Sequence, residues 1–556
     1  MRQSSDDAPT GPIRGEAPIA AMPPPQPPAN SGGAAAPPRR RNVRRDLTAA
    51  VLLVIAPLLP WNLYFGVGIP NGKTLLFAVL GAVTLLSLVA IAVPAGRVRA
   101  ILNVPYWLLV LGFVVFDVLE TIRFGGTVTI PGGVGPGAWL GIAGSILAAQ
   151  PVLAGPAAAR SEPARPSSWL RWARIIGYAS ILGATLSTAF NLFWRVRFAL
   201  RDTSGAGFGK QNISVIATAT VYGLVALVAV VIASGWLRKS DKAAQLAVSA
   251  LGASALVAGI VVWLLPVGRD IDAFHAIAQN TSTAGVGFEG YLAWAIGTAI
   301  LAPRALSGYR RAGPDDESSW RMAARKGLVL IIVWCLGSVL MRITDLAVGV
   351  ALDYPYSRYD SLTLAGFDLA TAVLAIWLRK KLGSSPVSSR LVTSLCGFLV
   401  TFSVARVVVG VMLAPRFLQP PGGAVNNPVY GNDLAQQITS TFDLALCGLA
   451  LGILIAARIS GQLSGRRRRR RVRRAAHTRR AVPGAPPPPS AAATTHIPAG
   501  APGQGTAPPS GPVPQLAGSG APRLFRGDDS ATRQIPLQPP AQGPVPKIYR
   551  PSQDSG

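Results

Sequence analysis

The chain is poor in the residues that build metal centres and disulfide frameworks. It has three cysteines and three histidines in 556 residues. No two cysteines have the spacing of a zinc site or a disulfide framework. Each cysteine lies within an apolar run, which is typical of small core residues. The histidines are scattered and form no ligand cluster. The sequence therefore predicts no metal and no cofactor.

Signatures of common catalytic sites are also missing. The chain contains no P-loop, no Gly-x-Ser-x-Gly and no His-Glu-x-x-His motif. Because no nucleophile or metal constellation is visible, we predict no catalytic residues, and an intramembrane enzyme ranks third among the function classes considered. We also expect no cleavable signal peptide, since the first apolar run starts near Leu47, after a long polar arm.

Acidic residues are scarce relative to basic ones. The chain has 24 Asp and Glu against 53 Lys and Arg, a formal net charge of +29, yet half of its residues are hydrophobic. These features fit together when apolar residues form membrane spans and basic residues collect in the loops. The basic clusters flank apolar runs, which favours a membrane protein over a nucleic-acid-binding protein.

Two low-complexity arms flank the apolar region. Residues 1–46 and 458–556 are rich in Pro, Ala, Gly and Ser, a composition that cannot bury a core, so we expect both arms to be disordered. The C-terminal arm begins with the run Arg466–Arg471. This run is either a stop-transfer signal alone or a binding site for anionic lipids as well, because each basic residue near a membrane surface contributes about 1 kcal/mol.

Twelve apolar segments lie within residues 47–457, and a bilayer core requires roughly 20 residues per helix. Their approximate ranges are 47–67, 74–95, 101–121, 137–155, 173–194, 212–236, 243–266, 287–303, 327–350, 361–378, 391–413 and 434–457. The fourth, eighth and tenth are the weakest candidates, because they are short or Gly-rich. We predict an all-α, polytopic membrane helix bundle of about twelve transmembrane helices with disordered cytoplasmic arms.

Basic residues alternate between the predicted loops. The inner loops carry clusters such as Arg379-Lys380-Lys381, whereas the outer loops are Gly-, Pro- and Asn-rich, as in Pro420-Pro421-Gly422-Gly423. The exception is a basic stretch from Arg195 to Lys210, after the fifth segment. The positive-inside rule then predicts a multi-pass protein of the cell (inner) membrane with both termini in the cytoplasm.

Ionisable residues recur inside the apolar segments. A charge at a helix centre costs roughly 2.5–3.5 kcal/mol on insertion scales, so such residues tend to face the bundle interior or a wet cavity. We expect an intramembrane charge network of Glu289, Arg342, Asp345, Asp368, Arg406 and Asp443. A second group on one stripe of the third segment comprises Asp117, Glu120 and Arg123.

The spacing of these residues predicts their depth and some of their partners. Arg342 and Arg406 each follow a flanking basic residue by about 16 residues, or about 24 Å of helix, which places both in the outer half of the membrane. Asp443 has a similar height, which favours pairing with Arg406. Asp368 is expected to lie deeper. Asp345 comes three residues after Arg342 and can pair with it within one helix.

A repeated dipeptide marks the second half of the chain. A Phe followed by an acid opens the eighth, tenth and twelfth segments, at Phe288-Glu289, Phe367-Asp368 and Phe442-Asp443. The repeat indicates that this half is built from three related helical hairpins. Duplicated units are frequent in transporters, which favours that class.

Two interpretations of the charges stay open. The first is a polar, outward-facing cavity for a charged or zwitterionic substrate in a transporter-like or substrate-binding protein. The second is structural ion pairs in a non-catalytic membrane scaffold of the cell envelope, whose tails recruit partners. The first requires the following residues to converge on one solvent-reachable cavity: Glu289, Arg342, Asp368, Arg406 and Asp443. Dispersed packed pairs would favour the second.

The C-terminal arm contains one candidate phosphorylation site, Thr532. Acids precede this Thr at Asp528 and Asp529, and Ile535 and Leu537 follow it. The pattern resembles the acceptor sites of receptor-like Ser/Thr kinases of actinobacteria. A phosphothreonine with Ile three residues on also resembles a ligand for forkhead-associated domains. The alternative is a chance match in an ordinary disordered tail.

Two families of multi-spanning proteins do not fit. The major facilitator superfamily usually has a long central loop, whereas the corresponding segment here, Leu237 to Lys242, is short; the position of its acidic motif reads Gly96-Arg97-Val98-Arg99, without the Asp. Lipid-linked-sugar glycosyltransferases carry acids in the first outer loop, and Trp61 to Gly66 has none. The Ala/Arg/Gly/Pro-rich chain with low-complexity tails resembles uncharacterised multi-spanning membrane proteins of high-GC actinobacteria. This resemblance covers composition and implies no activity.

Overall fold

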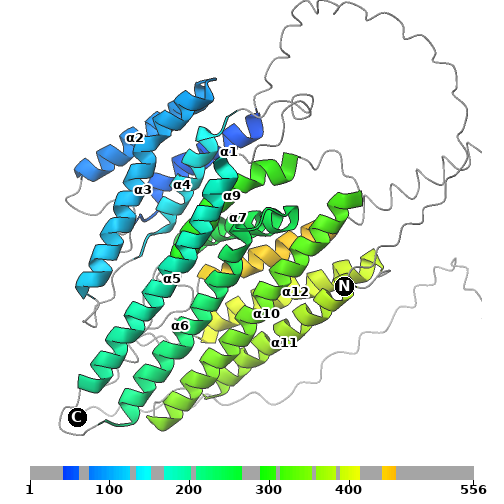
Figure 1. Cartoon of the computed structure of the whole chain (residues 1–556). Coiled ribbons are helices and arrows are strands. Elements are labelled where there is room, and N and C mark those ends of the chain that lie inside the picture. Colours follow the sequence, from blue (N-terminus) through cyan, green and yellow to red (C-terminus); the bar gives the residue numbers. More distant parts are fainter. Residues whose placement is uncertain are drawn as a thin grey trace, which may run out of the picture. The chain divides into compact units, whose positions relative to one another are not determined.

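The computed structural model describes ten stretches of the chain, and the helices within them are shown in Figure 1. These stretches are 42–61, 74–124, 133–151, 168–201, 208–265, 288–307, 314–352, 358–383, 388–413 and 441–458. They contain helices and no β-strand, which confirms the all-α class. The chain divides into two units, Met1–Ala481 and Val482–Gly556, and the described helices all belong to the first. The arginine run and Thr532 lie outside the described residues.

Each of the twelve predicted segments overlaps a helix in the described part of the chain. The helices are α1 (Val43–Ile55), the 3-10 turn η1 (Ala56–Leu58), α2 (Thr74–Ala92), α3 (Gly96–Phe124), α4 (Pro136–Ala149), α5 (Ser168–Arg201), α6 (Lys210–Leu237), α7 (Lys242–Leu264), α9 (Phe288–Ser307), α10 (Pro314–Ala351), α11 (Arg358–Gly383), α12 (Ser389–Leu413) and the last helix (Thr441–Arg458).

Nine of the described helices are long and apolar enough to cross a membrane: α2, α3, α5, α6, α7, α10, α11, α12 and the last helix. The other three have physical reasons to fall short. α1 has 13 residues and α4 has 14, about 20 Å of helix each, against a bilayer core of about 30 Å. α9 carries Glu289, Pro303 and Arg304 within its 20 residues. The number twelve therefore stays a prediction.

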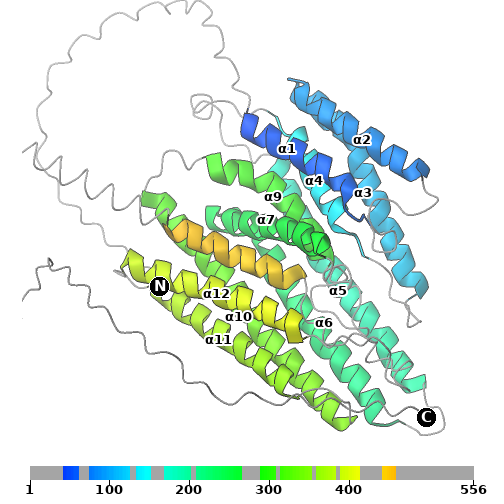
Figure 2. The same cartoon turned by 180° about the vertical axis from the view of Figure 1, so that it is seen from behind.

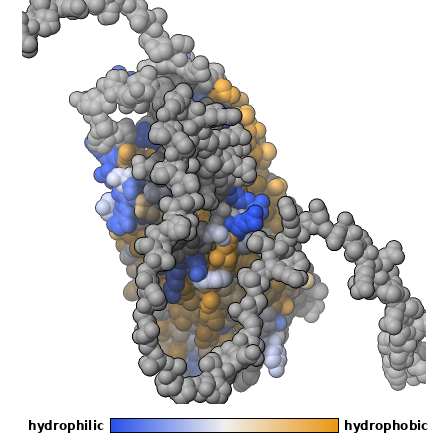
Figure 3. Space-filling view, turned by 90° about the vertical axis from the view of Figure 1, so that its right-hand side faces the viewer, coloured by the Kyte–Doolittle hydropathy of each residue, from blue (hydrophilic) through white to orange (hydrophobic). Residues whose placement is uncertain are grey.

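Apolar side chains cover much of the outside of these helices. Only 22% of the most apolar stretch of α3, and the same share of α5, is buried against other helices. Figure 3 shows apolar residues over much of the visible described surface. An outer surface of this kind suits lipid, because exposed apolar patches of such extent are rare on water-soluble monomers. Nine apolar helices with this surface indicate a multi-pass membrane protein.

α4 forms the packing centre of the first half. All of its residues from Pro136 to Ala149 are buried, and it contacts α1, α3 and α9. Small residues permit this close packing: Gly141 lies against the ring of Tyr106, and Gly144 lies against Leu53. Short length and complete burial thus go together in this helix.

The second half places four helices around the predicted charges. α10 contacts α11, α6 and α7, and α11 contacts α12 (Figures 1 and 2). The last helix, drawn in orange, packs between α7 and α10: its Gly448 lies against Ser254 of α7, and its Leu449 lies against Gly327 of α10. This arrangement lets α10, α11, α12 and the last helix direct side chains toward one another.

Candidate functional site

One face of α10 carries a polar stripe through an otherwise apolar helix. Trp334, Ser338, Arg342 and Asp345 are separated by four, four and three residues, which places them on one side of the helix. All four are buried. This group, which we call the α10 stripe, spans about 17 Å along the helix axis, roughly half of a bilayer core.

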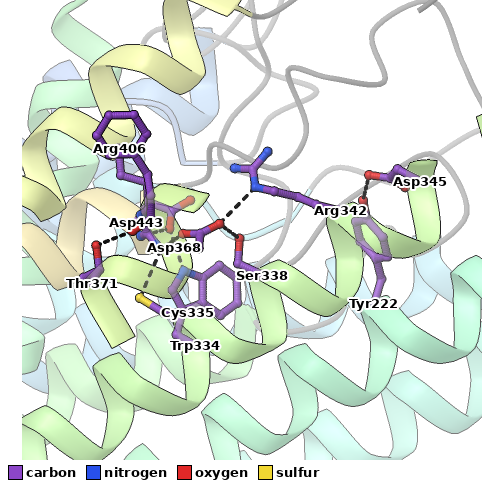
Figure 4. Close-up of polar contacts among 11 residues, drawn as sticks. Tyr222, Trp334, Cys335, Ser338, Arg342, Asp345, Asp368, Thr371, Arg406 and Asp443 are labelled. Atoms are coloured by element: carbon purple, nitrogen blue, oxygen red, sulfur yellow. Dashed lines mark hydrogen bonds and ion pairs between the residues drawn. The ribbon is translucent and has the colours of Figure 1, made fainter. Parts of the chain in front are cut away.

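Asp368 of α11 is the hub of the contacts made by this stripe (Figure 4). The carboxylate is fully buried and accepts three hydrogen bonds. Ser338 Oγ donates at 2.7 Å and Arg342 Nε at 2.9 Å, both to Oδ2, while Arg406 Nη1 donates to Oδ1 at 2.7 Å. One acid is thus shared by two arginines from different helices, as a buried carboxylate requires if it is to stay charged.

Arg406 of α12 extends the contacts to the last helix. Its Nη2 forms an ion pair with Asp443 Oδ1, the same oxygen that accepts a hydrogen bond from Trp334 Nε1. Arg342, Asp368, Arg406 and Asp443 therefore form a continuous series of alternating charge across α10, α11, α12 and the last helix. We call this series the charge chain. Its two positive and two negative charges cancel.

An aromatic cluster encloses the Asp443 end of the charge chain. Phe442 packs edge-on against Trp334 with ring centroids 4.8 Å apart, and against Trp294 at 5.6 Å. Tyr291 contacts both Trp294, at 5.7 Å, and Phe442, at 6.4 Å. Rings in this position keep water away, and a low local dielectric strengthens the ion pairs that they surround.

The opposite end of the α10 stripe faces α6. Tyr222 Oη donates a hydrogen bond to Asp345 Oδ2 at 2.6 Å. The sequence predicts that Arg342 and Asp345 can pair within α10, but the Nε hydrogen bond of Arg342 goes to α11 instead. The reason is geometric: Asp368 of a neighbouring helix lies within hydrogen-bond reach of Arg342 Nε, and Tyr222 occupies Oδ2 of Asp345.

The remaining predicted residues lie in other surroundings. Glu289 belongs to α9, and its side chain packs against Gly183 of α5. Asp117 of α3 lies within electrostatic reach of Glu289. In the same stripe of α3, Glu120 and Arg123 form an ion pair of 3.8 Å, in which the Arg123 side chain is 73% exposed. The charge chain itself runs through Arg342, Asp368, Arg406 and Asp443.

Three functional-site residues were not predicted from the sequence. Ser338 and Trp334 precede Arg342 by four and eight residues, so extending the helical spacing of the charged residues would have found them. Tyr222 lies on α6, more than a hundred residues away along the chain, and no local pattern points to it. In the described part of the chain, no group of three or more His, Cys, Asp or Glu side chains could hold a metal ion.

Comparison with known proteins adds a family but no activity. Residues 42–462 match a family model described as "Domain of unknown function (DUF7937)". The match begins just before α1 and extends beyond the last helix, so it includes the α10 stripe and the charge chain. No curated protein and no solved structure matches the chain.

Proposed function

We propose that this chain, which belongs to the DUF7937 family, is a substrate-binding or transporter-like protein of the cell membrane whose site lies along the charge chain. One observation carries the proposal: oppositely charged side chains from four helices meet inside an apolar bundle. Holding helices together does not require such residues, because well-packed apolar side chains of similar volume are often equally or more stabilising. Four intramembrane charges therefore favour a role in binding.

The connectivity suggests how binding would act on the bundle. Arg406 shares its guanidinium between Asp368 and Asp443. A charged solute that competes for one of these partners would break one link between two helices and leave the other in place. Such an exchange gives the bundle two alternative sets of contacts, and a ligand shifts a conformational equilibrium by its different affinity for the two states.

A non-catalytic scaffold is the second candidate, and a specific observation favours it. The four charged side chains are buried and their charges cancel, as in ion pairs that only fix helix register. In this role, the cytoplasmic arms would recruit partners, Arg466–Arg471 would bind anionic lipids, and Thr532 would be phosphorylated by a Ser/Thr kinase and then captured by a forkhead-associated domain. No catalytic residue enters either proposal.

A quadruple apolar variant separates the two candidates. Arg342→Met, Asp368→Leu, Arg406→Met and Asp443→Leu together replace the charge chain by side chains of similar size, so the variant should fold with comparable or higher stability. The measurement is the thermal unfolding midpoint of the purified protein with a panel of anionic, cationic and zwitterionic solutes.

For a binding protein, at least one charged solute raises the midpoint of the wild type and leaves the apolar variant unchanged. A matched control replaces the exposed ion pair Glu317–Arg321 on α10 by Leu and Met, and this variant should respond like the wild type. If no charged solute shifts the wild type, the binding proposal is wrong and the scaffold remains.

A further inference from the structure

Polar groups without a hydrogen-bond partner gather where α6 meets the end of the α10 stripe. Asp345 Oδ1 and Thr218 Oγ1 are buried and have none. Arg342 uses Nε for Asp368, and its two terminal nitrogens, Nη1 and Nη2, form no hydrogen bond or ion pair with the described residues. In Figure 4 these nitrogens are turned away from Asp368. A buried polar atom without a partner costs about 1–3 kcal/mol, so this arrangement needs an explanation.

The register of the two helices brings these groups together. Tyr222 lies opposite Asp345, and Val225 lies opposite Gly337, so α6 and α10 run antiparallel. Thr218, one turn before Tyr222, therefore lies beside the turn of α10 that follows Asp345, and Arg342 lies in the turn before it. The terminal nitrogens of Arg342, the carboxylate of Asp345 and the hydroxyl of Thr218 thus follow one another along the helices over about two turns, or about 11 Å.

There is also open space next to this end of the α10 stripe. A Cβ added at Gly349, one turn beyond Asp345 on the same face, would meet no atom within 4 Å. The Arg342 side chain keeps 6% of its surface exposed, whereas its partner Asp368 keeps none. We call the group at this end of the polar residues, Thr218, Tyr222, Arg342 and Asp345, the outer polar cluster.

The charge balance defines which ligand fits. Arg342 and Arg406 are matched by Asp368 and Asp443, so Asp345 is a fifth charge without an ion-pair partner in this series. A simple anion on the free edge of Arg342 would lie beside Asp345, and a simple cation on Asp345 would lie beside Arg342. A molecule that carries both charges avoids either repulsion and gives partners to the terminal nitrogens of Arg342 and to Asp345 Oδ1 at once.

We propose that the outer polar cluster binds a small zwitterion with an oxyanion at one end and a primary ammonium at the other. The Nη1 and Nη2 fork of Arg342 donates to the oxyanion, since guanidinium groups bind carboxylates and phosphates in a bidentate manner. The ammonium donates to Asp345 Oδ1 and Thr218 Oγ1. The same chemistry occurs in free amino acids and in ethanolamine phospholipid headgroups. This inference rests on the proposed function and names its substrate class.

The test compares zwitterions with analogues that carry one charge. Glycine, β-alanine and γ-aminobutyrate are titrated into the purified full chain by calorimetry, each against the carboxylate and the amine of the same carbon length. We expect one zwitterion to bind at least about tenfold more tightly than both of its analogues, because each singly charged analogue leaves either the terminal nitrogens of Arg342 or Asp345 Oδ1 without a partner.

Two conservative variants and a matched control link this preference to the cluster. Asp345→Asn should weaken binding of the zwitterion by about tenfold or more, and Thr218→Val by a few-fold. Thr344→Val removes a hydroxyl that donates only to Leu340 O of its own helix and should leave the affinity unchanged.

Repeating the titration in phosphatidylglycerol and phosphatidylethanolamine nanodiscs shows whether the natural zwitterion is a free solute or a lipid headgroup. Binding lost only with phosphatidylethanolamine indicates that the lipid headgroup occupies the cluster.

Two results would overturn the inference. One is the absence of any preference for zwitterions at all three lengths, and the other is a preference that survives both Asp345→Asn and Thr218→Val. Singly charged solutes that still stabilise the wild type but not the quadruple apolar variant would leave the proposed function standing. If no charged solute stabilises the wild type, both the inference about zwitterions and the proposed binding function are wrong.

Discussion

Arg406 is the residue on which the charge chain depends most, because it holds two acids from two helices. Its Nη1 pairs with Asp368 and its Nη2 with Asp443. Asp368 also has Arg342, whereas the other partner of Asp443 on its ion-paired oxygen is the neutral Trp334. Removing Arg406 alone therefore breaks the ion pair at Oδ1 of the buried Asp443.

We predict that Arg406→Ala destabilises the protein more than the double substitution Arg406→Ala with Asp443→Ala. Breaking one partner of a buried pair costs roughly 3–5 kcal/mol, and the second substitution removes the charge that causes this penalty. A double-mutant cycle on thermal unfolding measures the coupling. The exposed pair Glu317–Arg321 serves as the control, with an expected coupling of about 0.3–0.5 kcal/mol. Additive losses for Arg406 and Asp443 would show that the two residues do not interact.

Thr532 is the second residue for which we make a prediction, although it lies outside the described residues. Phosphorylation would add about −1.5 to −2 charges to the basic C-terminal arm and would weaken its binding to anionic lipid. We expect phosphopeptide mapping of the protein from its own host to find Thr532 modified. Thr494 has the same Ile three residues on but lacks the preceding acids, so it should be modified less. Good coverage of the tail without phosphate on Thr532, under growth and stress, would refute the hypothesis.

At the scale of elements, α7 and α9 pack so closely that a larger residue does not fit at one glycine of α7. A Cβ at Gly252 of α7 would collide with the backbone oxygen of Trp294 and with Thr298 Oγ1, both on α9. Thr298 Oγ1 also donates a hydrogen bond to Val248 O of α7, at 3.1 Å. Small residues at helix crossings allow such contacts in membranes.

We therefore predict that Gly252→Ala lowers the stability by about 1–3 kcal/mol, the usual cost of overpacking. The measurement is the thermal unfolding midpoint in detergent. Gly81→Ala in α2 is the matched control, since a Cβ there meets nothing within 4 Å, and the added helix propensity should leave stability equal or up to about 1 kcal/mol higher. Equal midpoints for both variants would argue against the close α7–α9 packing.

At the scale of the whole molecule, the number of membrane crossings decides on which side the termini lie. The nine long apolar helices of the described residues alone would place the two ends of the chain on opposite sides, because nine is odd. The basic residues near both ends instead predict two cytoplasmic termini. The two observations agree if either one or all three of the remaining helices, α1, α4 and α9, also cross.

Reporter fusions measure this topology directly. Fusions at Gly313 and Gly383 should report the cytoplasm, and fusions at Gly133 and Gly423 should report the outside, because the basic loops stay inside. The loss of a single crossing reverses every loop that follows it. A cytoplasmic signal at Gly423 would therefore rule out twelve spans.

The sequence by itself determined where the helices lie and which helices supply the residues of the charge chain. Apolar runs near the length of a bilayer core are a local property, so all twelve predicted segments overlap helices of the described part of the chain. The number of residues between each charge and the basic end of its helix also predicted similar membrane depths for Arg406 and Asp443. This estimate works because the rise per residue is constant within a helix. The ion pair between them agrees with that estimate.

Only the tertiary structure decided which side chains meet between helices. Arg342 contacts Asp368 on α11, and Asp345 contacts Tyr222 on α6, although Arg342 and Asp345 are three residues apart on one helix. The Glu289 side chain packs against Gly183 of α5. The physical reason is that spans surrounded by lipid are apolar on nearly every side, so periodicity does not show which face is turned inward. The rotation and neighbours of each helix follow instead from close contacts such as Gly448 against Ser254, and residues far apart in the chain supply them.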